Sequence, residues 1–306
     1  MQDVKCNNCG ADEPAPLNRG PDLLLNRPGD FRLVRCQACG LIYQNPQPEV
    51  DELAQYYPDE YLPYKKRVDE LGFVKRRDEQ YSLNRRCRQL MNHWQPPGRL
   101  LDVGCSTGLF LNAMRAFGWD VEGVELSEFA ANYAREQFGL KVATGTLEEA
   151  LLPGESFDVV TLYDVLEHVI DPKSTLREIH RILKPGGMIL LSLPNPDSFE
   201  AKLFGSSWVG WDRPRHLHIF SASVLRRYLV EAGFDFGHVE SLGGRLGLSL
   251  LSFRFYCNAR GVSEEWSRRL INIIYNWPLR LLTWPAYRMM ELMNRSTVMT
   301  VVAFRQ

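Results

Sequence analysis

Four cysteines near the start of the chain have the spacing of metal ligands. Cys6 and Cys9 form one Cys-x-x-Cys pair, and Cys36 and Cys39 form a second pair after 26 intervening residues. A two-residue spacer lets both thiolates of a turn point at one ion, and the glycine that follows each pair permits the backbone angles of such a turn. Four thiolates close a tetrahedral site, so the sequence predicts a structural zinc ion in a ribbon module at residues 1–48.

The predicted ribbon module is electrically neutral. Residues 1–48 contain five basic and five acidic side chains, and the whole chain of 306 residues has a formal net charge of −1. A protein that holds phosphate backbones on its surface is visibly basic. The charge therefore disfavours nucleic acid as a partner of the ribbon.

A second set of residues has the spacing of a nucleoside site. The apolar run RLLDV at 99–103 ends in the loop GCSTG, and Glu125 stands 21 residues after Gly104 at the end of the next apolar run. A dinucleotide fingerprint needs glycine at three positions where this chain has Gly104, Ser106 and Leu109, so hydride transfer with NAD is disfavoured. An acid at the end of a second strand is placed to accept hydrogen bonds from both hydroxyls of a ribose.

Strands and helices that alternate along the chain would bring these residues together. The expected strands are 99–103, 119–125, 157–162 and 188–193, and the expected helices include 109–117, 128–138 and 173–183. This alternation predicts an α/β fold with a doubly wound, mostly parallel sheet and helices on both faces. In such sheets the ligand lies past the carboxyl ends of the strands, where the glycine loop and Glu125 are expected.

Four segments resemble successive motifs of class I S-adenosylmethionine-dependent methyltransferases: LLDVGCSTGLFL, VEGVELS, FDVVTLYDVLEHVIDP and LKPGGMILLSLPN. They stand in that family's order and spacing, and the resemblance covers about residues 98–243. It implies a Rossmann-like sheet of seven strands, methyl transfer as the activity and S-adenosylmethionine as the cofactor. Ser106 stands where the family commonly has a middle glycine, and Thr146 replaces a frequent acid.

The resemblance also implies contacts to the cofactor. Gly104 and Gly108 let the backbone approach the methionine half, and Asp102 supports the amino group. Glu125 binds the ribose. The implied contacts to the adenine are Leu126, Thr146 and Leu147, and those to the sulfonium end are Tyr163 and Asp164.

Methyl transfer from a sulfonium is an in-line displacement, so alignment and exclusion of water do much of the work. A hydroxyl acceptor also benefits from a base within reach as its proton leaves. The candidate bases are His168, in the segment LEHV, and His216 and His218, in the segment RPRHLHIFS. The alternatives are pocket lining for His168 and hydrogen bonding within a loop for the other two. Trp208 and Trp211 indicate an acceptor wall or ordinary packing.

Two stretches lie outside the expected methyltransferase core at 98–243 and 297–306. Residues 49–97 predict a linker with lid helices, whose many basic side chains indicate a solvated face or an anion-binding lid. Residues 244–296 predict a helical amphipathic insertion in which arginines and tryptophans interleave. This composition is typical of peripheral contact with an anionic membrane, through 247–293, and the alternatives are a cap on the fold or a dimer interface.

The sequence thus predicts methyl transfer to a small-molecule, sugar or lipid-linked glycan acceptor, at a hydroxyl oxygen. Carbon methylation of a nucleotide sugar is an alternative, but the sugar C-methyltransferases that share the four-cysteine module usually carry a further C-terminal domain. An RNA methyltransferase that uses the ribbon and a non-catalytic cofactor-binding protein are two others. Since a secretory signal and a long apolar run are both lacking, we expect a cytoplasmic protein, or a peripheral one at the inner membrane face. The oligomeric state stays open.

Overall fold

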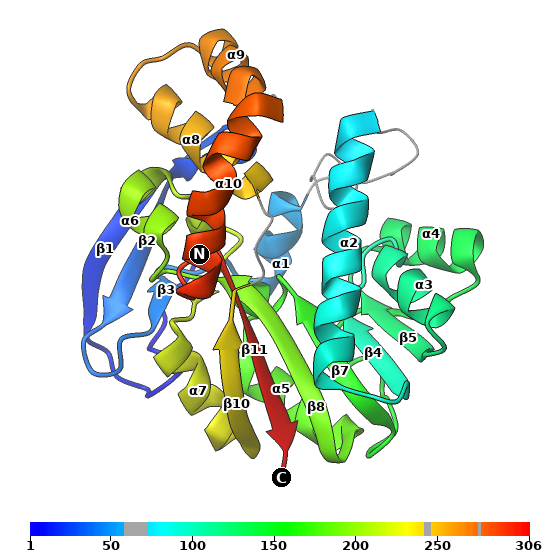
Figure 1. Cartoon of the computed structure of the whole chain (residues 1–306). Helices are drawn as coiled ribbons and strands as arrows, with labels where there is room; N and C mark the ends of the chain where they lie inside the picture. Colours follow the sequence, from blue (N-terminus) through cyan, green and yellow to red (C-terminus); the bar gives the residue numbers. More distant parts are fainter. Residues whose placement is uncertain (58–72, 242–245, 275–276) are drawn as a thin grey trace. The chain divides into compact units, whose positions relative to one another are not determined.

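The computed structural model describes residues 1–57, 73–241, 246–274 and 277–306 (Figure 1). The described residues form a four-stranded sheet, in the order β1-β2-β3-β9, and a seven-stranded sheet, in the order β10-β11-β8-β7-β4-β5-β6. The chain divides into two compact units, which we describe separately. Unit 1 comprises Met1–Tyr56, Leu193–Leu225 and Val239–Thr300, and unit 2 comprises Tyr57–Ser192, Arg226–His238 and Val301–Gln306.

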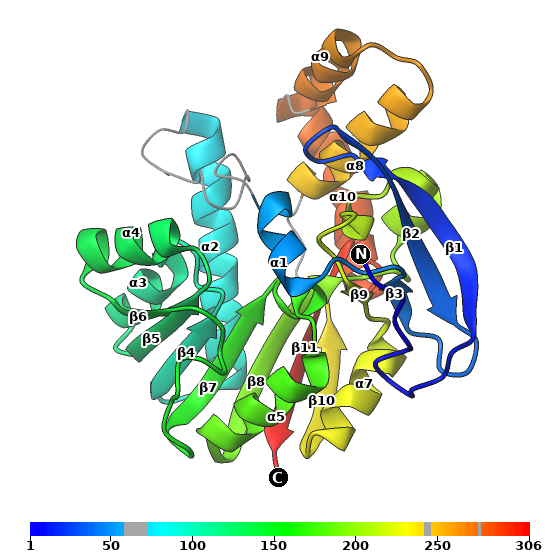
Figure 2. The same ribbon diagram turned by 180° about the vertical axis from the view of Figure 1, so that it is seen from behind.

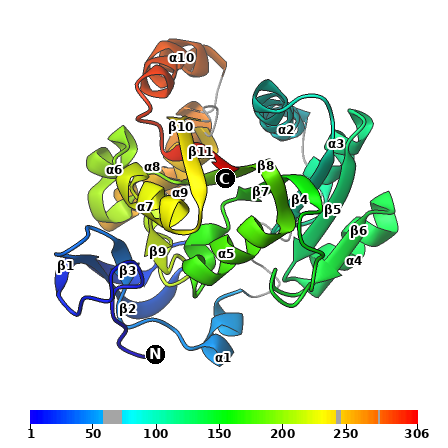
Figure 3. The same ribbon diagram turned by 90° about the horizontal axis from the view of Figure 1, so that it is seen from below.

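The seven-stranded sheet confirms the predicted α/β class. Its strands are β4 (Arg99–Val103), β5 (Asp120–Glu125), β6 (Lys141–Thr144), β7 (Phe157–Tyr163), β8 (Leu183–Pro194), β10 (Phe234–Glu240) and β11 (Val298–Arg305). Neighbours from β6 to β8 pair in parallel, and Figure 3 shows the strands in their order from β10 to β6. The strand order reverses at β4, which lies between β5 and β7, so the carboxyl end of β4 is the switch point where such sheets bind ligands.

Helices cover both faces of this sheet within unit 2. They are α2 (Phe73–His93), α3 (Leu109–Ala116), α4 (Glu128–Phe138) and α5 (Pro172–Ile182), and α7 (Ala222–Glu231) precedes β10. Figure 1 shows α2 in front of the sheet, and Figure 2 shows α5 on the opposite face. Cys87 and Leu90 of α2 pack with Met114 of α3 and with Leu100 and Val159 of the sheet, all buried.

Local signals determine where these helices begin and end. The Ser127 side chain accepts a hydrogen bond from the N–H of Ala130 and so begins α4, and Gly139 ends the helix in the left-handed conformation. Asp171 caps α5, with Pro172 at its first position. The strand after α5 begins five residues before the expected Met188, because Leu183 already pairs with Phe157 of β7.

The four-stranded sheet belongs to unit 1. Its antiparallel strands are β1 (Pro14–Asp22), β2 (Arg27–Cys36), β3 (Ile42–Gln44) and β9 (His218–Ile219). The expected loop around His218 is therefore partly a strand, which pairs with Tyr43 and Ile42 of β3. Trp208 and Trp211 pack beneath it with Leu33, so the segment before β9 shares a core with the N-terminal hairpin.

A wholly buried arginine joins the same two segments of unit 1. Arg215 donates to both carboxylate oxygens of Asp22, at the end of β1, at 2.7 Å each. It also donates to both oxygens of Asp212, at 3.0 and 2.6 Å. Arg215 and Asp22 are buried and the Asp212 side chain is 8% exposed, so each charge depends on the others for compensation.

Unit 1 also contains α-helices. They are α1 (Val50–Leu53), α6 (Phe199–Phe204), α8 (Leu246–Ala259), α9 (Glu264–Ile274) and α10 (Trp277–Leu292), so the predicted helical insertion before the last strand is confirmed. Residues 58–72 of the expected lid, and 242–245 and 275–276 around the insertion, lie outside the described residues. Among the described helices, none combines the length and the apolar character that crossing a bilayer requires.

Candidate cofactor and metal sites

The loop after β4 is shaped by residues in left-handed backbone conformations. Gly104 has φ +73°, Ser106 has φ +49° and Gly108 has φ +76°. A Cβ added to Gly104 would lie 2.5 Å from Val165, and one added to Gly108 would lie 2.6 Å from Leu140. Glycine is therefore required at both ends of the loop by backbone angle and by packing, whereas Ser106 accepts some strain where the family has glycine.

Glu125 ties this loop to the end of β5. The side chain is buried, and its carboxylate accepts hydrogen bonds from the backbone N–H groups of Ser106 and Ser127, each at 2.8 Å. Burial raises the pKa of the carboxyl above its ordinary value, while hydrogen bonds from Ser127 and Ser106 act in the opposite direction. Carboxylate oxygens can each accept more than one hydrogen bond, so the group suits the hydroxyls of a ribose.

Asp102 lies one strand away, within β4. It is buried and accepts a hydrogen bond from the Thr161 hydroxyl at 2.6 Å. Burial raises the pKa of Asp102 to about 7, against the lowering effects of Thr161 and of the Arg86 charge. A cation bound beside this carboxyl would favour its ionised form, so the group fits the amino end of the expected cofactor.

An arginine of α2 lies beside the end of β7. The sequence pattern had indicated a solvated face for this basic helix. The Arg86 guanidinium of α2 lies 4.7 Å from the centre of the Tyr163 ring, and one of its nitrogens is 4.0 Å from the Asp164 carboxylate. Asp164 has φ +59°, and its N–H donates to the carbonyl of Ser192 at 2.8 Å. The signal that could have identified Arg86 is its place next to Cys87, on the buried stripe of α2.

The three residues expected around the adenine differ in exposure. Leu126, directly after Glu125, is 63% exposed, whereas Leu147 is buried. An apolar side chain so exposed beside a buried acid offers a surface for a flat ring. The Thr146 hydroxyl and N–H both donate to Glu149, at 3.0 and 2.8 Å. The contact of these residues with adenine stays a prediction.

His168 is held by a tyrosine of the same unit. It lies in the short helix Leu166–His168 after β7, and its Nδ1 is 2.9 Å from the Tyr57 hydroxyl. The two rings meet edge to face, with centroids 6.0 Å apart. This contact fixes the orientation of the imidazole through Nδ1.

His216 and His218 belong to unit 1, where both are buried. The Nδ1 of His216 is 2.8 Å from the carbonyl of Gly210, and His218 lies in β9 opposite Tyr43. Unit 2 thus contains His168 together with the expected cofactor residues. In unit 1, His216 lies within hydrogen-bonding distance of a backbone carbonyl and His218 is part of a strand. Catalysis by either one stays a prediction.

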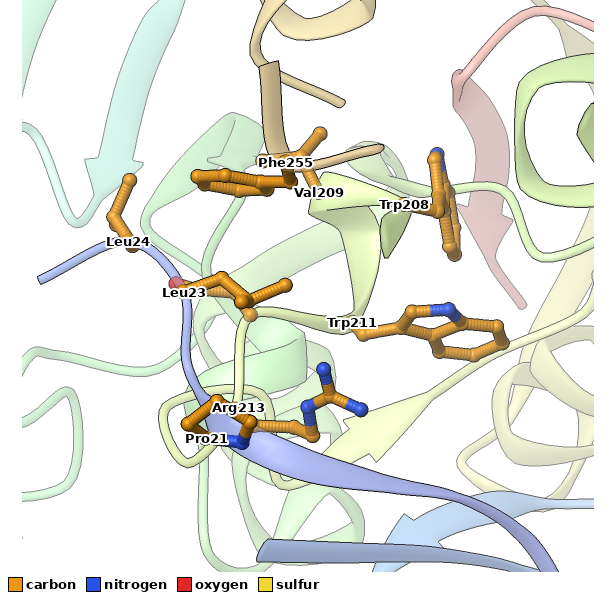
Figure 4. A pocket seen from close by; sticks show the side chains of 9 residues that line it. Pro21, Leu23, Leu24, Trp208, Val209, Trp211, Arg213 and Phe255 are labelled. Atoms are coloured by element: carbon orange, nitrogen blue, oxygen red, sulfur yellow. The ribbon is translucent and has the colours of Figure 1, made fainter. Parts of the chain in front are cut away.

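A pocket in unit 1 has aromatic walls (Figure 4). It is lined by Pro21, Leu23, Leu24, Trp208, Val209, Trp211, Asp212, Arg213 and Phe255. The rings of Trp208 and Trp211 lie perpendicular to each other, with centroids 4.9 Å apart, and both side chains are mostly buried in the core. Packing therefore accounts for most of their surface, and their place in an acceptor wall stays a prediction.

The four N-terminal cysteines converge as their spacing predicted. Their Sγ atoms all lie within 4.8 Å of one another, with 3.4 Å between Cys6 and Cys39 and 3.6 Å between Cys9 and Cys36. Zinc–sulfur bonds of about 2.3 Å in a tetrahedron place sulfurs about 3.8 Å apart, so these thiols fit a zinc ion. All four are free of disulfides, and four sulfur ligands leave no open position for substrate.

Comparisons with known proteins agree with this geometry. Residues 75–239, more than half of the chain, match a family model described as "Methyltransferase domain". The chain is 38% identical over 148 residues to a Cereibacter sphaeroides protein named "Ubiquinone biosynthesis O-methyltransferase", and 42% identical over 148 residues to a Ruegeria pomeroyi protein of the same name. Each match covers 45% of this chain and 60% of the relative's length.

The solved structure of the cyclase SpnF is similar in fold. It aligns with a TM-score of 0.51 and 19% sequence identity, over 85% of this chain and 98% of that chain. At this identity the likeness concerns the fold alone. The matched family model begins after the four-cysteine module. The prediction of zinc binding therefore rests on the convergence of the four cysteines.

Proposed function

The chain belongs to the methyltransferase-domain family and is an S-adenosylmethionine-dependent methyltransferase, and on this premise we propose that it methylates a hydroxyl oxygen of a small-molecule, sugar or lipid-linked glycan acceptor. The observation that carries the proposal is the His168–Tyr57 pair, a base with a fixed orientation, in the unit that contains the expected cofactor residues. The two relatives are O-methyltransferases by name, which agrees with oxygen as the acceptor atom.

The donor set around β4, β5 and β7 fits S-adenosylmethionine, which supplies an electrophilic methyl group on a sulfonium when it is bound. Glu125 would accept hydrogen bonds from the ribose hydroxyls, and Leu126 would cover one face of the adenine. Asp102 would hold the amino group, and Arg86, whose charge acts on Asp102, would pair with the carboxylate. A buried acid and a neighbouring arginine match the two opposite charges of an amino acid.

His168 would act on the acceptor. Its Nε2 would accept the hydroxyl proton as the oxygen attacks, because an imidazole takes up a proton near neutral pH. Tyr57 would be a positioning residue, which holds the ring through Nδ1. The four cysteines would hold zinc as a structural ion of the N-terminal module.

Two substitutions test this assignment with any acceptor that turns over. His168→Gln should lower kcat by about 10²–10⁴-fold and leave the affinity for S-adenosylmethionine unchanged, and Tyr57→Phe should lower kcat less. His180→Gln is the matched control, because His180 of α5 packs against Gly233 and Phe234. This variant should keep full turnover. Unchanged kcat in His168→Gln would refute the base assignment.

A further inference from the structure

Helices α9 and α10 of unit 1 expose a set of large apolar side chains. The exposed residues are Trp266, Leu270, Ile273, Leu282, Trp284, Met289, Leu292 and Met293, which we call the α9–α10 face. Trp266, Leu270 and Ile273 follow one another at intervals of four and three residues, so they share one face of α9. Trp266 is 59% exposed, Trp284 63% and Leu282 74%. Since α9 packs against α8 and α10, both exposed stretches belong to one helical cluster.

Positive charge accompanies this apolar surface. Residues 246–296 contain seven arginines and three glutamates, with no lysine or aspartate, in a chain whose formal net charge is −1. Arg268 pairs with Glu264 at 2.9 Å, and Arg269 with Glu265 at 2.5 Å. Even with every glutamate paired, the arginines remain in excess. The cluster is therefore both apolar and cationic.

We propose that the α9–α10 face binds the surface of an anionic lipid bilayer. A helix that lies in the plane of a membrane buries its apolar side chains at the boundary of headgroups and acyl chains, while neighbouring arginines reach the phosphates. Tryptophan is enriched at that boundary because its ring is apolar and its indole N–H is polar. The Arg269 guanidinium lies 5.0 Å from the centre of the Trp266 ring, which places both kinds of group together on α9.

The charge argues against two other occupants. In a two-fold dimer the same surface meets itself, so the arginine excess of one copy would face that of the other, which is unfavourable. Nucleic acid would match the charge, but its interfaces are polar and would leave the apolar side chains uncovered. An anionic bilayer matches both properties at once.

Sedimentation with vesicles tests this proposal on the full chain, without reference to methyl transfer. The protein should bind vesicles of phosphatidylcholine and phosphatidylglycerol, bind those of phosphatidylcholine alone much less, and dissociate as salt is raised. The double variant Trp266→Glu/Leu270→Glu should partition at least about tenfold less. The matched control is Leu151→Glu in unit 2, at a leucine that is 86% exposed, and it should bind like the wild type.

All three substituted residues are exposed, so each variant should fold. Thermal melting of each variant checks this. Equal vesicle binding by the wild type and the double variant would overturn the proposal, and so would equal binding to neutral vesicles. A dimer in analytical ultracentrifugation that the double variant dissociates would assign the face to a second copy. Salt-sensitive binding of RNA that the double variant loses would assign it to nucleic acid.

Discussion

Replacing Glu125 perturbs the cofactor site at the point where the loop after β4 meets the end of β5. The carboxylate accepts backbone hydrogen bonds from Ser106 and Ser127, each at 2.8 Å. A carboxylate offers about four lone-pair positions, so the group can accept further hydrogen bonds from the ribose hydroxyls. We predict that Glu125→Gln and Glu125→Ala both weaken binding of S-adenosylmethionine, and that alanine has the larger effect.

The magnitude follows from the number of hydrogen bonds lost. A hydrogen bond to a charged group contributes about 1.5–3 kcal/mol. Glutamine replaces one acceptor oxygen by an NH₂ group, so Glu125→Gln should weaken binding by about tenfold to a hundredfold, at about 1.4 kcal/mol per factor of ten. Glu125→Ala removes both acceptors, about 3–6 kcal/mol, which corresponds to about 10²–10⁴-fold.

Isothermal titration calorimetry with S-adenosylmethionine measures these affinities directly. Glu122→Gln is the matched control, because Glu122 is a buried glutamate of the same strand that pairs with Lys141 at 2.8 Å and with Arg99. An odd separation of three residues puts the two side chains on opposite faces of β5. The control should lower the melting temperature and keep the affinity. Cofactor binding by Glu125→Ala at wild-type strength would refute the assigned role of Glu125.

Three further predictions concern other buried groups. Burial raises the pKa of Asp102 to about 7, so the folded protein favours the protonated carboxyl. The free energy of unfolding should therefore fall as pH rises toward 7, because the buried group loses its proton. Thermal melting across this pH range should show this fall in the wild type and not in Asp102→Asn. Affinity of the wild type for the cationic cofactor should rise through pH 7, and calorimetry should find it flat in Asp102→Asn. Cys6→Ser should abolish zinc binding, as measured by elemental analysis, and should lower the melting temperature of the N-terminal module. The affinity for the cofactor should be unchanged, and a collapse of that affinity would contradict the prediction. Arg215→Leu leaves Asp22 and Asp212 buried without their partner and should cost about 3–5 kcal/mol in urea unfolding, less when combined with Asp22→Asn; additive losses would contradict the coupling.

Local sequence signals predicted four of the seven strands, β4, β5, β7 and β8, whereas the number seven was implied by the resemblance to a known family. These four strands contain short apolar runs, and the Ser127 hydroxyl caps α4, so these elements carry their own signals. Strand β9 could not be predicted, because two residues have no periodicity and its partner Tyr43 lies 175 residues earlier in the chain. Buried contacts of this kind depend on tertiary structure, which no single segment encodes.

The candidate site divides in the same way. Spacing alone predicted that the four cysteines converge and that Glu125 lies at the end of a strand, as the structure has them. The contact of Tyr57 with His168 and that of Arg86 with Tyr163 join residues far apart in sequence, and the positive charge of α2 does not by itself show which arginine contacts the aromatic ring. The roles assigned to individual residues toward the cofactor stay predictions until binding is measured.

Transfer of a labelled methyl group to oxygen is the most direct measurement. The protein would be incubated with S-adenosylmethionine labelled with carbon-13 at the methyl group, and with phenolic, sugar and lipid-linked glycan acceptors that carry a free hydroxyl. We predict a product whose labelled carbon has the NMR shift of a methyl ether, and its loss in Glu125→Ala. A label on carbon or nitrogen of the acceptor, or on RNA offered in the same screen, would contradict transfer to a hydroxyl oxygen.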